Sequence, residues 1–141
     1  TSGGRLVVLD VMRVQREASD VPRLISEVAA LDGVNVPVGI EDAFYFSRLI
    51  TDDLLKRPEM HKYSVKKIKP EADKFSRALP FAARVGNDQV DVLNRHWTRD
   101  YMDELAAFPM GTHDDQVDAT SGAYALLGQR QGLTVEASRW A

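Results

Sequence analysis

The chain has 141 residues, enough for a hydrophobic core, and its 44% hydrophobic and 28% charged content is typical of a globular protein. The absence of cysteine excludes disulfides, zinc–thiolate sites and cysteine nucleophiles, so a bound metal would need oxygen ligands or one of three histidines. No apolar run could cross a bilayer, and neither a secretory signal pattern nor a GxxxxGK[ST] phosphate loop is present.

The net charge is −3, but the charges are distributed unevenly. Between Lys56 and Arg84 lie nine of the 18 Lys and Arg residues and only three acids, so this segment carries +6 and the rest −9. A basic stretch on an acidic protein suits contact with a phosphate backbone through one face. A solvated basic helix and strand would explain the same charge pattern equally well.

The first half of the chain alternates between predicted strands and helices. Runs of β-branched and apolar residues indicate strands over 5–14, 35–40 and 61–68. One helix is expected after a Ser19–Asp20 cap, and another over about 45–57. The inner face of the first helix is predicted to carry Val21, Leu24, Ile25, Val28 and Leu31.

The second half is predicted to be mostly helical. Pro70 opens a helical stretch that Pro80 should kink or end, and 85–93 reads as a strand or one arm of a hairpin. Two further helices are expected over 97–108 and about 112–127. The inner face of the first of these should carry Trp97, Tyr101, Leu105 and Phe108. We therefore expect an α/β protein with one domain over 1–128 and a loosely ordered tail over 129–141.

Three carboxylates, Asp114, Asp115 and Asp118, lie within five residues at the predicted start of the last helix. Asp114 and Asp118 are one turn apart and share a face, and Asp115 is three residues from Asp118. Such carboxylates repel one another unless a cation lies between them, and Mg²⁺ or Mn²⁺ would accept their oxygens. Spacing alone favours a simpler interpretation, in which the acids stabilise the helix dipole and Thr112 forms a capping box with Asp115.

An acidic pair and several basic residues are further candidates. Glu41 follows a predicted buried strand directly, and the carboxyl ends of strands are where α/β sheets build sites. An acid there is also a common way to begin a loop, and from the residues alone that interpretation is better supported. Lys74 and Arg77 share a face of a predicted helix and could contact phosphates, although Asp73 and Arg77 could equally form a surface ion pair.

The motifs of the chain occur in one order. DKFSRA at 73–78 is followed by Pro80, Gly86, Val90 and Trp97, then Glu104 and FP at 108–109, then GTHDDQVDA at 111–119. VLDV at 8–11 and IED at 40–42 fit the same pattern. Together they resemble the C-terminal nuclease region of the large terminases of tailed phages and prophages, over nearly the whole chain up to Leu127.

The resemblance implies an RNase H-like fold, with a mixed central sheet flanked by helices, and a metal-dependent endonuclease. The activity would be two-metal cleavage of double-stranded DNA during phage genome packaging, with Mg²⁺ or Mn²⁺ as cofactor. By resemblance, Glu41 supplies the second catalytic acid and the Asp114–Asp115 pair the third. Asp118 would be either a supporting ligand or a group that contacts the ligands rather than the metal. The residues expected to hold the DNA backbone are Lys66, Lys67, Lys74 and Arg77.

The same resemblance implies partners and a location. The partners would be double-stranded DNA, the ATPase domain of the same parent polypeptide, and the portal and small terminase proteins. No membrane is involved, and the location would be the cytoplasm of the bacterial host. The family's first catalytic aspartate lies on a strand before 5–14 and Asp10 does not replace it, so we expect a missing N-terminal strand and an incomplete metal site. The chain would be inactive if the remaining acids do not suffice.

Two other functions remain open at this stage. The first is a module that binds DNA or docks on the portal without cutting, which would show no dependence on metal or on Asp114 and Asp115. The second is a resolvase- or transposase-like nuclease of the same superfamily, which a preference for branched DNA would indicate.

Overall fold

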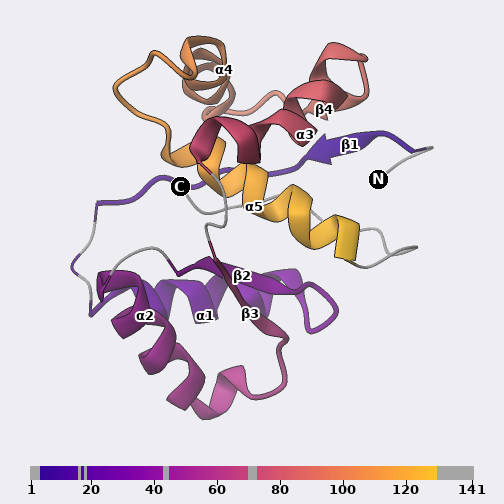
Figure 1. Ribbon diagram of the computed structural model, residues 1–141. Helices are drawn as coiled ribbons and strands as arrows, with labels where there is room; N and C mark the ends of the chain where they lie inside the picture. The colour runs from indigo at the N-terminus through magenta and orange to yellow at the C-terminus, as the bar shows by residue number, and fades with distance from the viewer. Residues whose placement is uncertain (1–3, 16, 18, 43–44, 70–72, 130–141) are drawn as a thin grey trace. The chain divides into compact units, whose positions relative to one another are not determined.

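The computed structural model describes residues 4–15, 17, 19–42, 45–69 and 73–129 (Figure 1). The chain divides into two compact units, one made of 1–14 and 72–141 and the other of 15–71. Pro70 and, beyond Gln129, the predicted tail lie outside the described residues. Strands and helices alternate in each unit, which confirms the α/β class. No helix in the described residues is long and apolar enough to span a membrane.

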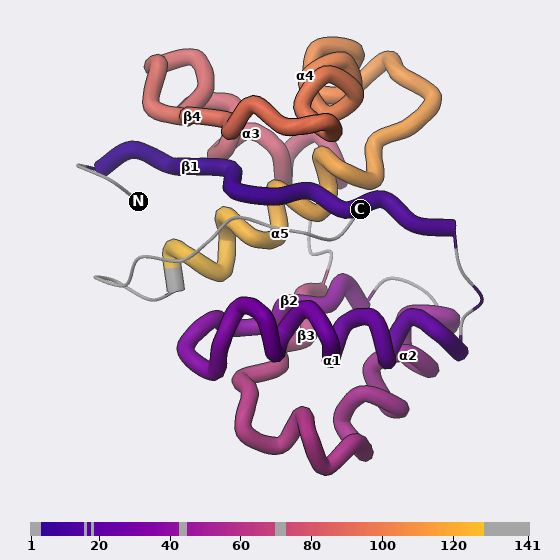
Figure 2. Tube along the Cα trace, turned by 180° about the vertical axis from the view of Figure 1, so that it is seen from behind, coloured from indigo at the N-terminus to yellow at the C-terminus, as the bar shows by residue number. Residues whose placement is uncertain are grey.

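The unit formed by 15–71 is built on a parallel pair of strands. Strand β2 (Val38–Glu41) pairs with β3 (Val65–Ile68), with Val38 opposite Val65. Helices α1 (Val21–Asp32) and α2 (Tyr45–Lys56) contact each other, and a single 3-10 turn, η1 (Pro58–Met60), follows α2. Helix α1 lies behind the strand pair in Figure 1 and in front of it in Figure 2, which is seen from the opposite side. The buried apolar residues of this unit include Ile25, Val28, Ala29, Val38, Leu54 and Met60.

The other unit contains the second strand pair and three helices. Strand β1 (Leu6–Val8) lies parallel to β4 (Val90–Val92), and Arg5 clamps the Asp91 carboxylate with nitrogen–oxygen distances of 2.9 and 2.8 Å. Helix α5 (Asp115–Gln129) packs against both α3 (Lys74–Gly86) and α4 (Thr98–Ala107). The centre of the core is formed by Val8, Val11, Trp97 and Tyr101.

Several predicted boundaries are wrong. The first strand covers three residues rather than 5–14, because its partner β4 ends at Val92, where the chain turns toward α4. Asp20 precedes α1 without a side-chain capping bond, and Leu31, predicted to face inward, is 82% exposed near the end of that helix. The inner face of α1 instead uses Pro22 and Ala29 together with Ile25 and Val28.

Helix α3 continues through Pro80, which was expected to kink or end it. The proline removes one internal hydrogen-bond donor, but its fixed φ is compatible with a helix. Beyond Pro80, Phe81 is buried and its ring meets that of Tyr124 on α5 edge-to-face, with centroids 6.3 Å apart. Tertiary packing therefore stabilises the helix beyond the proline, as far as Gly86. The strand predicted from residue 85 begins only at Val90.

Candidate functional site

The start of α5 carries the acidic cluster. The helix begins at Asp115, and the Asp118 N–H donates to the Asp114 carbonyl over 2.9 Å, which makes Asp114 the residue that precedes the helix. The predicted capping box of Thr112 with Asp115 is therefore wrong, because Thr112 lies outside the helix by three residues. Asp115 is exposed, and both it and Asp118 lie in the first turn, where the helix dipole favours negative charge.

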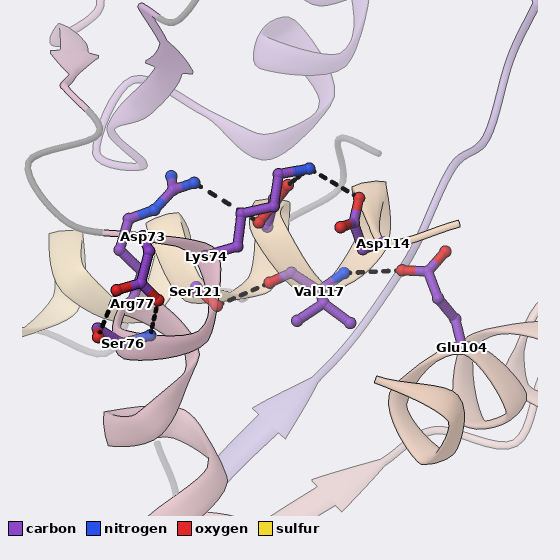
Figure 3. A network of polar contacts seen from close by, with 9 residues as sticks. Asp73, Lys74, Ser76, Arg77, Glu104, Asp114, Val117 and Ser121 are labelled. Atoms are coloured by element: carbon purple, nitrogen blue, oxygen red, sulfur yellow. Dashed lines mark hydrogen bonds and ion pairs between the residues drawn. The ribbon is translucent and has the colours of Figure 1, made fainter. Parts of the chain in front are cut away.

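Lys74 joins two of the three carboxylates (Figure 3). Its Nζ lies 2.9 Å from Asp114 Oδ1 and 3.1 Å from Asp118 Oδ2. A nitrogen of the Arg77 guanidinium lies 3.8 Å from the other oxygen of Asp118. The prediction that Asp114 and Asp118 share a face is confirmed, because one ammonium reaches both. Hydrogen bonds to Asp114 and then to Asp118 raise the pKa of Lys74, since both favour its charged form.

The start of α3 places these cations. Asp73 precedes the helix in an extended conformation, and its carboxylate accepts the Ser76 N–H and the Ser76 hydroxyl, each over 2.9 Å. The backbone hydrogen bond from Ser76 is the largest reason why the pKa of Asp73 is lowered. Lys74 and Arg77 are then three residues apart on the same helix, where both face Asp118. The capping role of Asp73 was missed, although a serine three residues after an aspartate was a usable signal.

A buried carboxylate, Glu104, holds α5 from the side of α4. Glu104 is only 7% exposed; its Oε2 accepts the Val117 N–H over 2.8 Å, and its Oε1 accepts the Gln116 side-chain amide over 3.0 Å. Val117 is in the first turn of α5, whose N–H groups have no partner within the helix. Sequence reasoning gave Glu104 no role, although an acid next to the predicted apolar face of Tyr101 and Leu105 was a signal.

The buried polar layer continues along α4 and α5. The Thr120 hydroxyl donates to the Gln116 carbonyl over 2.7 Å, so the Tyr101 hydroxyl, 2.8 Å away, is the donor to Thr120. Burial raises the pKa of Tyr101 to about 12. Every group named in this layer has a partner, so the layer fixes the register of α5 against α4.

The remaining predicted site residues belong to the unit formed by 15–71. Glu41 is the last residue of β2 and lies opposite Ile68. Lys66 and Lys67 are consecutive in β3, so their side chains point to opposite faces of the strand. Because Lys66 pairs with Gly39, it shares a face with Glu41, whereas Lys67 shares the other face with Ile40.

The carboxylates at the start of α5 are the type of ligand that a divalent ion such as Mg²⁺ or Mn²⁺ binds. Asp114 and Asp118 direct carboxylate oxygens toward one cation, the Lys74 ammonium, and carboxylate oxygens are the ligands that Mg²⁺ and Mn²⁺ prefer. Within the part of the chain that the structure describes, no three His, Cys, Asp or Glu side chains already converge as a metal-binding group. The described site therefore consists of two carboxylates that share the Lys74 ammonium, with the Arg77 guanidinium beside one of them.

These features define an α/β protein with an acidic helix start held against a basic helix. The terminase RNase H-like domain family matches residues 10–127, and the chain belongs to this family. The match confirms the resemblance and the RNase H-like class, and with it a nuclease-like domain of the phage packaging type. No curated protein and no solved structure gives a significant match.

Proposed function

We propose that this chain is the nuclease domain of a phage or prophage large terminase, which hydrolyses phosphodiester bonds of double-stranded DNA with Mg²⁺ or Mn²⁺ during genome packaging. The observation that carries the proposal is the convergence of Asp114 and Asp118 on one cation at the start of α5. This acidic start lies inside the region that matches the terminase RNase H-like family.

The proposed roles follow from the chemistry of each side chain. Glu41, Asp114 and Asp115 provide metal ligands, and Asp118, whose side chain is 9% exposed, supports them from the first turn of α5. When bound, a pair of divalent ions supplies an activated water and stabilises the leaving oxygen. Asp114 and Asp115 would hold such ions, because both lie at the start of the same helix.

DNA binding is assigned to cations on two elements. Lys74 and Arg77 lie on α3 beside the acids, and ammonium and guanidinium groups on a rigid element can bind phosphates without reading sequence. On β3, Lys66 is a better candidate for a DNA-backbone contact than Lys67, because it shares a face with Glu41. The proposed partners are double-stranded DNA, the ATPase domain of the parent polypeptide, and the portal and small terminase proteins, in the bacterial cytoplasm.

The test is nicking of supercoiled plasmid DNA in Mn²⁺, compared with EDTA. We expect the chain to nick in Mn²⁺ only, and an Asp114→Asn/Asp115→Asn variant to fall to the EDTA background. A matched control is Asp52→Asn/Asp53→Asn, which removes two exposed adjacent carboxylates from α2 and should leave nicking unchanged. Metal-dependent nicking that survives in the Asp114/Asp115 variant would place the site on other residues.

A second function is favoured by the +6 charge of the segment from Lys56 to Arg84. A DNA-binding or portal-docking module needs those cations but no metal. DNA binding that is insensitive to EDTA, together with no nicking by the unmodified chain, would support this function over the nuclease. Cleavage confined to branched DNA would instead indicate a resolvase-like substrate.

A further inference from the structure

We propose that Lys74 is an internal counter-cation of the acidic site, which competes with the divalent ion for the carboxylate oxygens of Asp114 and Asp118. The inference rests on the proposed metal-binding function. It adds a role that the family match does not supply, because it makes metal affinity depend on a lysine that is not a ligand.

The competition follows from the geometry at Asp118. One of its oxygens lies 3.1 Å from the Lys74 ammonium, and the other lies 3.8 Å from the Arg77 guanidinium. Both oxygens therefore face a cation from α3. A divalent ion binds carboxylate oxygens at about 2.0–2.2 Å, closer than any ammonium can approach. An ion on the oxygen held by Lys74 would have to displace that ammonium.

Asp114 shows that Lys74 is the main competitor. The ammonium lies 2.9 Å from Asp114 as well, so Lys74 bridges both carboxylates, whereas the Arg77 guanidinium approaches Asp118 at the longer distance of 3.8 Å. The Lys74 side chain is 50% exposed, and exposed ion pairs contribute little to stability. The ammonium itself can move into solvent, but the Asp118 side chain is only 9% exposed, so a divalent ion would have to replace the ammonium at that carboxylate, as a counter-ion exchange requires.

A purely structural role is the alternative. Lys74 could serve only to tie α3 to α5, in which case its removal would destabilise the protein and loosen the two acids. Mn²⁺ affinity would then fall or stay constant. A displaced counter-ion predicts the opposite sign, since its removal leaves the metal fewer contacts to break.

The experiment is titration calorimetry of the chain with Mn²⁺ alone, at low ionic strength. We expect Lys74→Met to tighten Mn²⁺ binding about fivefold, the equivalent of about 1 kcal/mol. Lys74→Arg, which keeps the charge, should remain close to the unmodified chain. Arg77→Met is the comparison variant: it removes one positive charge from the same helix, but one that lies 3.8 Å from a single carboxylate, so it should tighten binding less than Lys74→Met does. Lys56→Met, on α2, should have no effect.

The outcomes separate the inference from the proposed function. Equal tightening by Lys74→Met and Arg77→Met would overturn the inference in favour of a general field effect, and unchanged or weaker binding by Lys74→Met would overturn it in favour of a structural tie. In either case, loss of Mn²⁺ binding in Asp114→Asn/Asp118→Asn would still support the proposed metal site at these carboxylates. Mn²⁺ binding unaffected by that double variant would overturn both. Lys74→Gln replaces Lys74→Met if circular dichroism shows that the latter is unfolded.

Discussion

The two sides of α5 are held by different kinds of interaction. On the α4 side, a carboxylate that is 7% exposed satisfies two donors of the first turn. On the α3 side, an ammonium that is 50% exposed pairs with two carboxylates. Leaving a buried polar group unpaired lowers the free energy of unfolding substantially, whereas breaking an ion pair with an exposed partner lowers it little. The α4 side therefore fixes where the acids lie, and the α3 side leaves them open to exchange.

The largest expected effect lies on the buried side. Glu104→Ala leaves the Val117 N–H and the Gln116 amide without their partner, so we expect the free energy of unfolding to fall by about 3 kcal/mol. Urea denaturation monitored by circular dichroism measures it. Glu104→Gln keeps one acceptor and should lose clearly less. A loss below about 1 kcal/mol for Glu104→Ala would show that water replaces the carboxylate and that this side is not the stronger one.

The hydroxyl of Tyr101 tests the same buried layer with a smaller change. Tyr101→Phe removes the hydrogen bond to Thr120 and should cost about 1 kcal/mol at neutral pH.

The same variant gives a pH test of burial. The pKa of Tyr101 is raised to about 12, above an unfolded value of about 10. Its contribution to stability is therefore complete below pH 10 and is lost as the pH rises from 10 toward 12. Urea midpoints between pH 8 and 11 should fall more for the unmodified chain than for Tyr101→Phe. Parallel curves would contradict the burial of this hydroxyl.

The exposed side should respond to salt. Lys74→Met is expected to lower the free energy of unfolding by less than about 1 kcal/mol in low salt, and the difference should shrink in 1 M NaCl, where the Debye length is about 3 Å. The Glu104→Ala difference should persist in the same salt, because its hydrogen bonds are buried. Equal salt dependence of the two variants would remove the contrast between the two sides of α5.

The smallest expected effect is at the start of α3. Asp73→Ala removes the acceptor for the Ser76 N–H and should lower Tm slightly at pH 7. Because the pKa of Asp73 is lowered in the folded protein, its contribution is present above the unfolded value of about 4 and is lost as the pH falls through the lower, folded value. Thermal melts of Asp73→Ala and the unmodified chain should therefore converge in acid. Asp73→Asn, which keeps an uncharged acceptor, should retain most of the cap, and a pH-independent gap would contradict the role of the carboxylate.

Local spacing was enough to predict much of this site. The three-residue interval between Lys74 and Arg77 and the four-residue interval between Asp114 and Asp118 each put two side chains on one face of a helix, whatever the helix packs against. The helices over 21–32 and 98–107 follow from apolar residues at the same period. The Thr112 capping box failed for a related reason, because spacing alone cannot say at which residue a helix begins.

The sequence by itself determined the α/β class, the family and the acidic start of α5, because each depends on residues that are close together in the chain or occur in a fixed order. Only the tertiary structure decided that Lys74, 40 positions from Asp114, pairs with two of the acids, and that Glu104 holds the helix from its other side. Those partners come from different helices. Their meeting depends on how α3, α4 and α5 pack, which helical periodicity does not encode.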